Sequence, residues 1–222
     1  MVKSKDLKIL RKKLTKADRV VDPLQESNIP KTLMEPFQPP PEGASPEQPS
    51  LSLEYSLGVD VSDSLLNDMV GLFETNMGDM YRNSSFGLDL TEKADDFRHR
   101  KARHLLVFSP TEDGSKELAA FVHFRFDYDD DEYPSRVVLY VFEIQIEAAF
   151  RRRGMGRKLM KMMEYIAQAA GLDTVMLTVF KSNDDAMQFY TKSLMYVIDE
   201  SSPSKFGERA DYEILSRQLT TS

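Results

Sequence analysis

Three arginines followed by two closely spaced glycines form the segment with the clearest chemistry in this sequence. The segment lies between an apolar stretch and a pattern typical of a helix, and it reads Arg151-Arg152-Arg153-Gly154-Met155-Gly156. At such a junction a pyrophosphate meets free backbone N–H groups and the positive end of the helix dipole. Glycines allow the backbone to approach closely, and arginines donate charge-assisted hydrogen bonds to phosphate oxygens. The pattern therefore indicates a phosphate-binding turn, while a tight turn into a helix would explain the glycines alone.

Several other site classes are excluded. The P-loop spacing Gly-x-x-x-x-Gly-Lys-Ser/Thr is absent, and a dinucleotide-binding fingerprint would need a third glycine and a later acidic strand end. The chain has no cysteine, which excludes disulfides, thiolate nucleophiles and cysteine metal sites. His99, His104 and His123 show no metal-ligand spacing, so we expect no metal.

The elements that would position the glycine turn form an α+β pattern. The stretch from Val137 to Glu147 is apolar at nearly every position as far as Phe142, which is typical of a central strand buried on both faces. A helix is predicted from Met155 to Ala170, ending at Gly171. Periodicity and turn residues predict the other elements. These are strands near 51–57, 103–109, 118–127, 174–180, 196–199 and 212–218, helices near 62–81 and 183–193, and an irregular stretch at 84–101.

The first 50 residues differ in composition from the rest. We expect residues 1–21 to form a basic amphipathic helix that docks its apolar stripe on the body. The stripe consists of Leu7, Leu10, Leu14 and Ala17. Residues 22–50 contain eight of the eleven prolines, so we expect a Pro-rich linker or surface loop that packs no core. The folded domain is expected to span residues 51–222.

Charge is unevenly distributed along the chain. Residues 1–19 hold eight Lys or Arg and two Asp, a formal charge of +6 against −7 for the whole protein, which leaves the remainder at −13. Such an acidic body lacks the basic face of a nucleic-acid-binding protein, and it could attract a basic partner or serve solubility alone. Apolar stretches are far shorter than the roughly 20 residues of a membrane span. We expect a monomer that binds neither nucleic acid directly nor membranes.

The glycine turn carries a family resemblance. Arg-x-x-Gly-x-Gly between a long strand and a helix resembles the acetyl-CoA pyrophosphate loop of the GNAT acetyltransferases. Downstream, Asn183 and Phe189-Tyr190 resemble that family's last helix, where an Asn contacts the pantetheine arm and a Tyr often lies near the sulfur. The sequence departs from the family at Met195-Tyr196, where Gly-Phe is common. The resemblance implies the GNAT fold, a mixed, mostly antiparallel sheet of about seven strands flanked by helices, with acetyl-CoA as cosubstrate.

A narrower resemblance runs from about residue 51 to residue 217. Its segments resemble the NatD type of N-terminal acetyltransferase, which acetylates histone tails. They are Asp79-Met80-Tyr81, Phe124-Arg125-Phe126-Asp127, Leu139-Tyr140, Phe142-Glu143, residues 175–181, residues 201–204 and residues 212–217. That type often has a Trp shortly after the position of Tyr81, where this chain has Phe86 as the nearest equivalent. The resemblance implies acetylation of the α-amino group of histones that begin Ser-Gly-Arg-Gly (histones four and two-A), and a location in the nucleus and cytoplasm.

Acyl transfer to an amine needs a base. An α-amino group has a pKa near 8, so about a tenth is neutral at pH 7 and a mild base is enough. Glu143, on the central strand just before the turn, is the candidate, acting directly or through a water. The alternative is a strand carboxylate paired with an arginine. Backbone N–H groups of Ile144, Gln145 and Ile146 are expected to hold the thioester and polarise its carbonyl. Tyr190 could protonate the departing thiolate, but we interpret it mainly as a packing residue.

The resemblance also assigns two sets of binding residues. The cosubstrate set comprises Ile144, Gln145, Ile146, Arg151, Arg152, Arg153, Gly154, Met155, Gly156, Arg157 and Asn183. The peptide-groove set comprises Tyr81, Asp127, Tyr140, Phe142, Thr178, Ser201 and Tyr212. Asp199-Glu200 and the acidic loop 129–132 could attract a basic tail or be solvated charges.

Two further hypotheses stay open. The acceptor could instead be a lysine side chain or another amine. The chain could also be a non-catalytic acidic module that binds histone tails.

Overall fold

The computed structural model of the protein describes residues 4–20, 22–37, 51–130 and 132–220, and within them seven strands form one sheet. The strands are β1 (Ser52–Leu57), β2 (Arg103–Pro110), β3 (Lys116–Tyr128), β4 (Val137–Ile146), β5 (Thr174–Phe180), β6 (Val197–Ile198) and β7 (Tyr212–Gln218). Their order is β1-β2-β3-β4-β5-β7-β6, and every neighbouring pair is antiparallel except β4 and β5. The predicted fold class and the central place of β4 are both confirmed.

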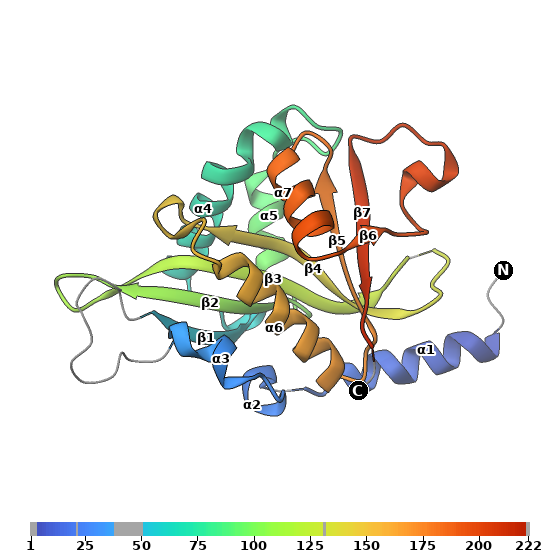
Figure 1. The fold of residues 1–222 in the computed structure, drawn as a ribbon, viewed down its shortest axis with the longest axis horizontal. Coiled ribbons are helices and arrows are strands. Elements are labelled where there is room, and N and C mark those ends of the chain that lie inside the picture. Colours follow the sequence, from blue (N-terminus) through green and yellow to red (C-terminus); the bar gives the residue numbers. More distant parts are fainter. Residues whose placement is uncertain (1–3, 21, 38–50, 131, 221–222) are drawn as a thin grey trace.

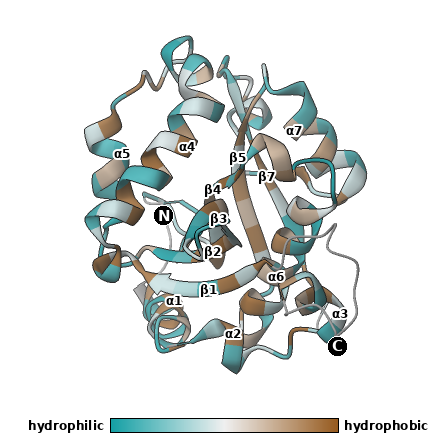
Figure 2. Ribbon diagram, turned by 90° about the vertical axis from the view of Figure 1, so that its left-hand side faces the viewer, coloured by the Kyte–Doolittle hydropathy of each residue, from teal (hydrophilic) through white to brown (hydrophobic). Residues whose placement is uncertain are grey.

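Helices cover both faces of the sheet. They are α1 (Ser4–Ala17), α2 (Pro23–Glu26), α3 (Lys31–Met34), α4 (Asp63–Arg82), α5 (Leu90–Phe97), α6 (Met155–Ala169) and α7 (Asp184–Gln188), the last continued by a π-helical turn at Phe189–Ser193. The helices α4 and α5 lie together on one face, whereas α6 crosses the other (Figures 1 and 2). Within the described ranges, no helix is long and apolar enough to cross a membrane.

Alternating strand residues build a separate core on each face. On the α4–α5 face, Leu106 and Phe121 pack with Phe73 and Phe97 from the two helices. On the α6 face, their strand neighbours Leu105 and Val122 join a larger core. That second core also takes in Leu14 and Ala17 of α1, and Leu10 packs against it, so these three residues of the expected apolar stripe dock on the body. This alternation follows from the two-residue period of a strand.

Residues 22–37 differ from the expected linker. They form α2, α3 and a 3₁₀ turn at Glu35–Phe37, and the buried Phe37 joins the core of the α6 face. Pro23 occupies the first turn of α2, where its missing N–H costs nothing, and the side chain of Asp22 accepts from the N–H groups of Leu24 and Gln25. The prediction that this stretch packs no core was therefore wrong for residues 22–37; residues 38–50 lie outside the described part of the chain.

The stretch 84–101, expected to be irregular, contains α5. Asp89 starts this helix by accepting hydrogen bonds from the N–H groups of Thr91 and Glu92, the usual role of an N-cap aspartate. The helix ends with Phe97, which is fully buried against Phe73. Although most residues of α5 are polar or charged, the helix has one apolar face, and the packing of this face places α5 beside the middle of the sheet.

Gly58 fixes how the end of α5 meets β1. A Cβ at this position would lie 2.6 Å from the carbonyl oxygen of His99, 2.7 Å from that of Phe97 and 2.8 Å from Cβ of Ala102. We expect Gly58→Ala to lower the free energy of unfolding by about 2 kcal/mol, because backbone must shift to admit the methyl group. Urea-induced unfolding measures this. Gly71→Ala on α4, where no atom lies within 4 Å of the added Cβ, should be neutral or stabilising; equal losses in both variants would contradict the explanation.

Candidate active site

The sheet opens between its two parallel strands. β4 and β5 pair only where Leu139 to Val141 meet Val175 to Leu177, although β4 continues to Ile146 and β5 to Phe180. Beyond this point the strands separate, so the facing edge of each loses its neighbour. The backbone N–H and C=O groups on such an edge are free to bind a ligand. A cavity of about 640 Å³ lies at this opening, and both strands contribute to its wall.

An irregularity in β4 sets the direction of Glu143. His123 of β3 pairs with Glu143 and the next residue, Phe124, pairs with Val141, so Phe142 is an extra residue in β4. Before this bulge, the odd-numbered Val137, Leu139 and Val141 belong to the core of the α6 face; after it, the even-numbered Ile144 and Ile146 pack against that core. A one-residue insertion reverses the alternation of side chains. The bulge therefore turns Glu143 toward α4 and α5, into the cavity.

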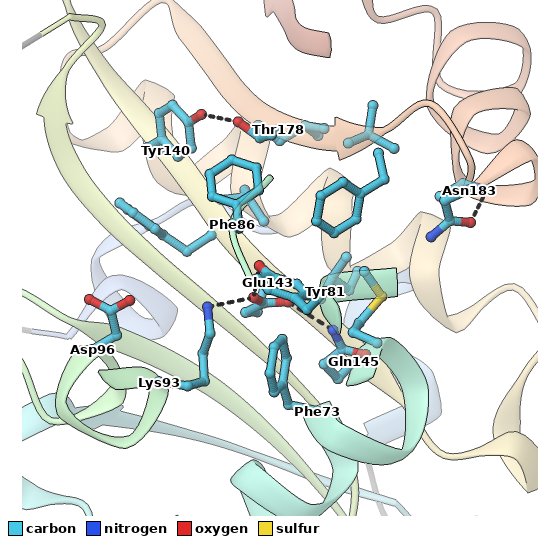
Figure 3. A pocket seen from close by; sticks show the side chains of 18 of the residues that line it. Phe73, Tyr81, Phe86, Lys93, Asp96, Tyr140, Glu143, Gln145, Thr178 and Asn183 are labelled. Carbon is cyan, nitrogen blue, oxygen red and sulfur yellow. Dashed lines mark hydrogen bonds and ion pairs between the residues drawn. The ribbon is translucent and has the colours of Figure 1, made fainter. Parts of the chain in front are cut away.

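Three side chains donate hydrogen bonds to the Glu143 carboxylate. Oε1 accepts from the hydroxyl of Tyr81 on α4 at 3.3 Å and from Nζ of Lys93 on α5 at 3.1 Å, and Oε2 accepts from Nε2 of Gln145 at 2.8 Å (Figure 3). The side chains of Glu143 and Lys93 are only 6% and 14% exposed. Burial, and then the charge of Glu143, raise the pKa of Tyr81 above its ordinary value. Tyr81 is therefore a neutral donor here.

Nine of the nineteen predicted site residues line the same cavity. Those that line the cavity are Tyr81, Asp127, Tyr140, Phe142, Glu143, Ile144, Gln145, Thr178 and Asn183. Two predicted groove residues lie outside its lining: Ser201, which donates to Asp199, and Tyr212, whose ring lies 5.2 Å from that of Phe86. Phe86 itself lines the cavity, so Tyr212 supports the wall from behind.

Tyr140, in the paired stretch of β4, and Thr178, one residue past the paired stretch of β5, connect the two strands. Their side-chain oxygens lie 2.6 Å apart (Figure 3). Burial raises the pKa of Tyr140 to about 12, so its hydroxyl stays protonated near neutral pH. The pair closes the apex of the opening with groups that can donate to, and accept from, a peptide backbone.

Internal cations already hold the carboxylates expected to attract a basic tail. Lys101 lies 3.3 Å from Asp127. Arg136 lies between Asp129 and Asp199, whose side chains are 5% and 2% exposed. Asp199 is therefore not an accessible acidic partner for a basic tail, and Asp129 is not a solvated loop charge. Through Arg136, the two carboxylates connect the loop after β3 to the loop after β6.

The glycine turn forms as its sequence predicts, at the N-terminus of α6. Gly154 has φ of 82°, a left-handed conformation that glycine adopts without strain. Arg152, Arg153 and Arg157 are exposed, whereas Met155 is buried. Arg151 differs from expectation: its guanidinium donates to the carbonyl of Ile146 and to Oδ1 of Asn76 on α4.

The far wall of the cavity comes from the segment after β5. Asn183 caps α7 by accepting from the N–H of Ala186 at 3.1 Å. Tyr190 lines the cavity and is buried, which raises its pKa. Met195, at the position where the resemblance leads us to expect glycine, takes φ of 60°, a strained conformation for a residue with a side chain.

Two buried histidines lie beneath the bulge. Nε2 of His104 donates to the carbonyl of Phe97 at 2.8 Å, and the His123 ring stacks on Phe142. Burial lowers the pKa of His104 to about 4, and burial followed by the neighbouring His104 and Arg125 lowers the pKa of His123 well below its ordinary value.

This histidine pair makes folding sensitive to acid. Unfolded histidines bind protons below about pH 6.5, whereas the folded pair stays neutral until much lower pH. The unfolded chain therefore gains protons first, so stability should be full above about pH 6.5 and fall as pH drops toward 4. Urea titrations between pH 7 and pH 5 measure this slope. His104→Asn should flatten it, and an unchanged slope would contradict the assignment.

Two residues that organise the site were missed in the sequence. Lys93 was missed because α5 was expected to be irregular; Asp89 followed by Glu92 three residues later is the helix-start signal that marks it. Asn76 lies within the helix predicted near 62–81, but nothing local shows that its amide reaches Gln145 and Ile146. Such contacts span about 70 residues of sequence, so only the assembled fold reveals them.

Comparison with known proteins identifies the class. Residues 72–195 match the model of the acetyltransferase (GNAT) family, and the chain belongs to this family. This protein is accordingly an acetyltransferase that uses acetyl-CoA. In the described ranges, no group of three His, Cys, Asp or Glu side chains is placed to hold a metal ion.

Solved structures share the fold at low identity. The chain is similar to Ard1 from Thermoplasma volcanium, with 16% identity, TM-score 0.52, and 77% of this chain and 99% of that one covered. It is similar to the NatC complex bound to Gag peptide and CoA, with 14% identity, TM-score 0.53 and coverage of 76% and 99%. It is also similar to NAA60 from Arabidopsis thaliana in complex with a bisubstrate analogue, with 13% identity, TM-score 0.52 and coverage of 77% and 100%.

Proposed function

We propose that this protein acetylates the α-amino group of protein N-termini, with histone tails that begin Ser-Gly-Arg-Gly as its substrate. The observation that carries the proposal is the Glu143 carboxylate, turned by the bulge into a cavity at the opening between β4 and β5. The same cavity has Tyr140 and Thr178 on its wall, two of the positions at which the sequence resembles the NatD type.

Glu143 would take the proton from the attacking amine. The amine nitrogen forms a bond to the carbonyl carbon of the thioester and the carbon–sulfur bond breaks. The sulfur leaves as a thiolate, which takes a proton from solvent or from the Tyr190 hydroxyl on the cavity wall, and Glu143 later returns its own proton to solvent. Because an α-amine titrates near pH 8, a carboxylate assisted by a water is a strong enough base. The donors from Tyr81, Lys93 and Gln145 hold the carboxylate in place.

The chain offers a matching path for acetyl-CoA, its second substrate. The left-handed Gly154 opens the turn at the start of α6, where free N–H groups and the exposed Arg152 and Arg153 suit a pyrophosphate. The unpaired edge of β4 from Ile144 to Ile146 suits the amides of the pantetheine arm and the thioester carbonyl. Asn183 lies on the opposite wall.

The acceptor side suits a basic peptide. Although Lys101 pairs with Asp127 and Arg125 with Asp96, the cavity lining is net negative, which favours a cationic partner. It holds six carboxylates against two cations: Asp89, Glu92, Asp96, Asp127, Asp129 and Glu143 against Lys93 and Arg125. A structural neighbour with the same fold is described as bound to a peptide and CoA, which is the kind of acceptor proposed here. We extend the proposal to a location in the nucleus and cytoplasm, and to action as a monomer.

Acetyl transfer from labelled acetyl-CoA to a Ser-Gly-Arg-Gly-Lys peptide tests this proposal, with the same peptide carrying a blocked N-terminus as control. Label on the free peptide alone is the expected result. Equal label on both peptides would move the reaction to the lysine side chain and overturn the proposal. No label on either, with acetyl-CoA still bound, would also overturn it and direct the search to other amines.

A non-catalytic histone-binding module makes a different prediction. It would bind the tail peptide equally well after Glu143→Gln and would form no acetylated product at any protein concentration. Product formation that depends on Glu143 excludes it.

A further inference from the structure

One continuous chain of hydrogen bonds connects the glycine turn to Glu143. Arg151, the first residue of the turn, donates to Oδ1 of Asn76 on α4. Nδ2 of Asn76 donates to Oε1 of Gln145 at 3.0 Å, and Nε2 of Gln145 donates to Oε2 of Glu143 at 2.8 Å. A second contact from Nδ2 of Asn76, 3.3 Å from the carbonyl oxygen of Ile146, fixes the same amide to the edge of β4.

Every donor in this chain points the same way. A guanidinium can only donate and an ionised carboxylate can only accept, so the orientation of both intervening amides is fixed by their end partners. The amide dipoles of Asn76 and Gln145 therefore align from the cation of Arg151 toward the anion of Glu143. Successive hydrogen bonds aligned in this way polarise and strengthen one another. Gln145 is itself buried, at 4% exposure, so little water competes for its amide.

We propose that Asn76 and Gln145 are positioning residues, which carry the orientation of the Arg151 turn to the catalytic carboxylate. This inference rests on the proposed role of Glu143 as base. It gives Arg151 a structural role at the start of the turn, beside the exposed Arg152 and Arg153 that face solvent. It also explains why an amide faces Glu143 from its own strand: Gln145 holds Oε2, while Tyr81 and Lys93 both hold Oε1.

Asn76→Asp tests the direction of the chain with little change in volume. The new carboxylate can still accept from Arg151, but it cannot donate to Gln145. It would accept from Nε2 of Gln145 and turn the amide oxygen toward Glu143. We expect kcat to fall by about 10- to 100-fold, with KM for acetyl-CoA nearly unchanged. Asn67→Asp, the same substitution at an exposed position of α4, should behave like the wild type.

Gln145→Glu provides a second readout, one that a purely structural role would not move. It places a like charge beside Glu143 and disfavours the ionised form of the pair. The acidic limb of the pH–rate profile should move to higher pH, and activity should recover as pH rises. A loss of activity that is the same at every pH, or wild-type kcat in Asn76→Asp, would overturn the inference.

A measurement without acceptor separates this inference from the proposed function. The side-chain amide signals of Gln145, assigned as those missing from the nitrogen-15 spectrum of Gln145→Leu, should exchange slowly with solvent and should shift in Asn76→Asp but not in Asn67→Asp. If the signals behave in this way while the histone peptide is not acetylated, the proposed substrate is wrong and the inferred series of hydrogen bonds is supported. If the peptide is acetylated and the signals exchange freely, the inferred series of hydrogen bonds is wrong and the proposed function is supported.

Discussion

Glu143→Gln should lower kcat for acetyl transfer by about 10²- to 10⁴-fold, the range that a positioned general base contributes. Glutamine has the same size as glutamate and can still contact Tyr81 and Lys93, but its amide cannot take a proton from the acceptor amine. Steady-state kinetics with the Ser-Gly-Arg-Gly-Lys peptide measures the loss. Acetyl-CoA affinity should change little, because the turn at Gly154 and the outer edge of β4 are untouched.

The pH dependence of that loss separates proton removal from mere packing. At pH 7 about a tenth of an α-amine is neutral, and by pH 9.5 nearly all of it is. The variant depends on amine that is already neutral, so its rate should rise about tenfold over this interval and its deficit against the wild type should shrink. Glu117→Gln, on an exposed position of β3, is the matched control. A deficit below tenfold, or one that is constant with pH, would contradict the role of Glu143 as base.

Local patterns were enough to predict much of the fold. The continuous apolar run in Val137–Phe142 identified the central strand, and the start of α6 followed from Gly154 and Gly156. The short helices at residues 22–37 and α5 were missed because their burial depends on partners elsewhere: Phe37 belongs to the core of the α6 face, and Phe97 packs on Phe73. Proline content and charge describe a segment alone, whereas packing depends on what lies opposite it.

The candidate site shows the same division. Glu143 could be singled out from its place before the glycine turn, yet a regular strand would point it into the core of the α6 face. Only the extra residue Phe142 turns it into the cavity, and a bulge has no signature in a run of apolar residues. Lys93 and Gln145 can donate to Glu143 only because the bulge points its side chain toward them. The chemical role of Glu143 could therefore be predicted from the sequence, whereas the face of the sheet on which it lies required the structure.

Lys93→Met should lower the free energy of unfolding by about 3 kcal/mol, because it leaves a buried carboxylate without its cation. Nζ of Lys93 lies 3.1 Å from Oε1 of Glu143, and its charge also lies over the rings of Phe73 and Tyr81, at 4.8 Å and 5.1 Å from their centroids. Methionine fills a similar volume, so the loss reports mainly on charge. Urea-induced unfolding at pH 7, followed by circular dichroism, measures it.

The double variant Lys93→Met, Glu143→Gln should recover most of this stability, to within about 1 kcal/mol of the wild type, because a neutral pair replaces an unpaired charge. Lys101→Met is the control for removing a lysine from an ion pair. Its partnership with Asp127 is more exposed, 27% and 23% for the two side chains, so its loss should stay below about 1 kcal/mol. If Lys93→Met proved as stable as the double variant, or as stable as Lys101→Met, then water would reach Glu143 freely. The base would then be held by Tyr81 and Gln145 rather than by the lysine.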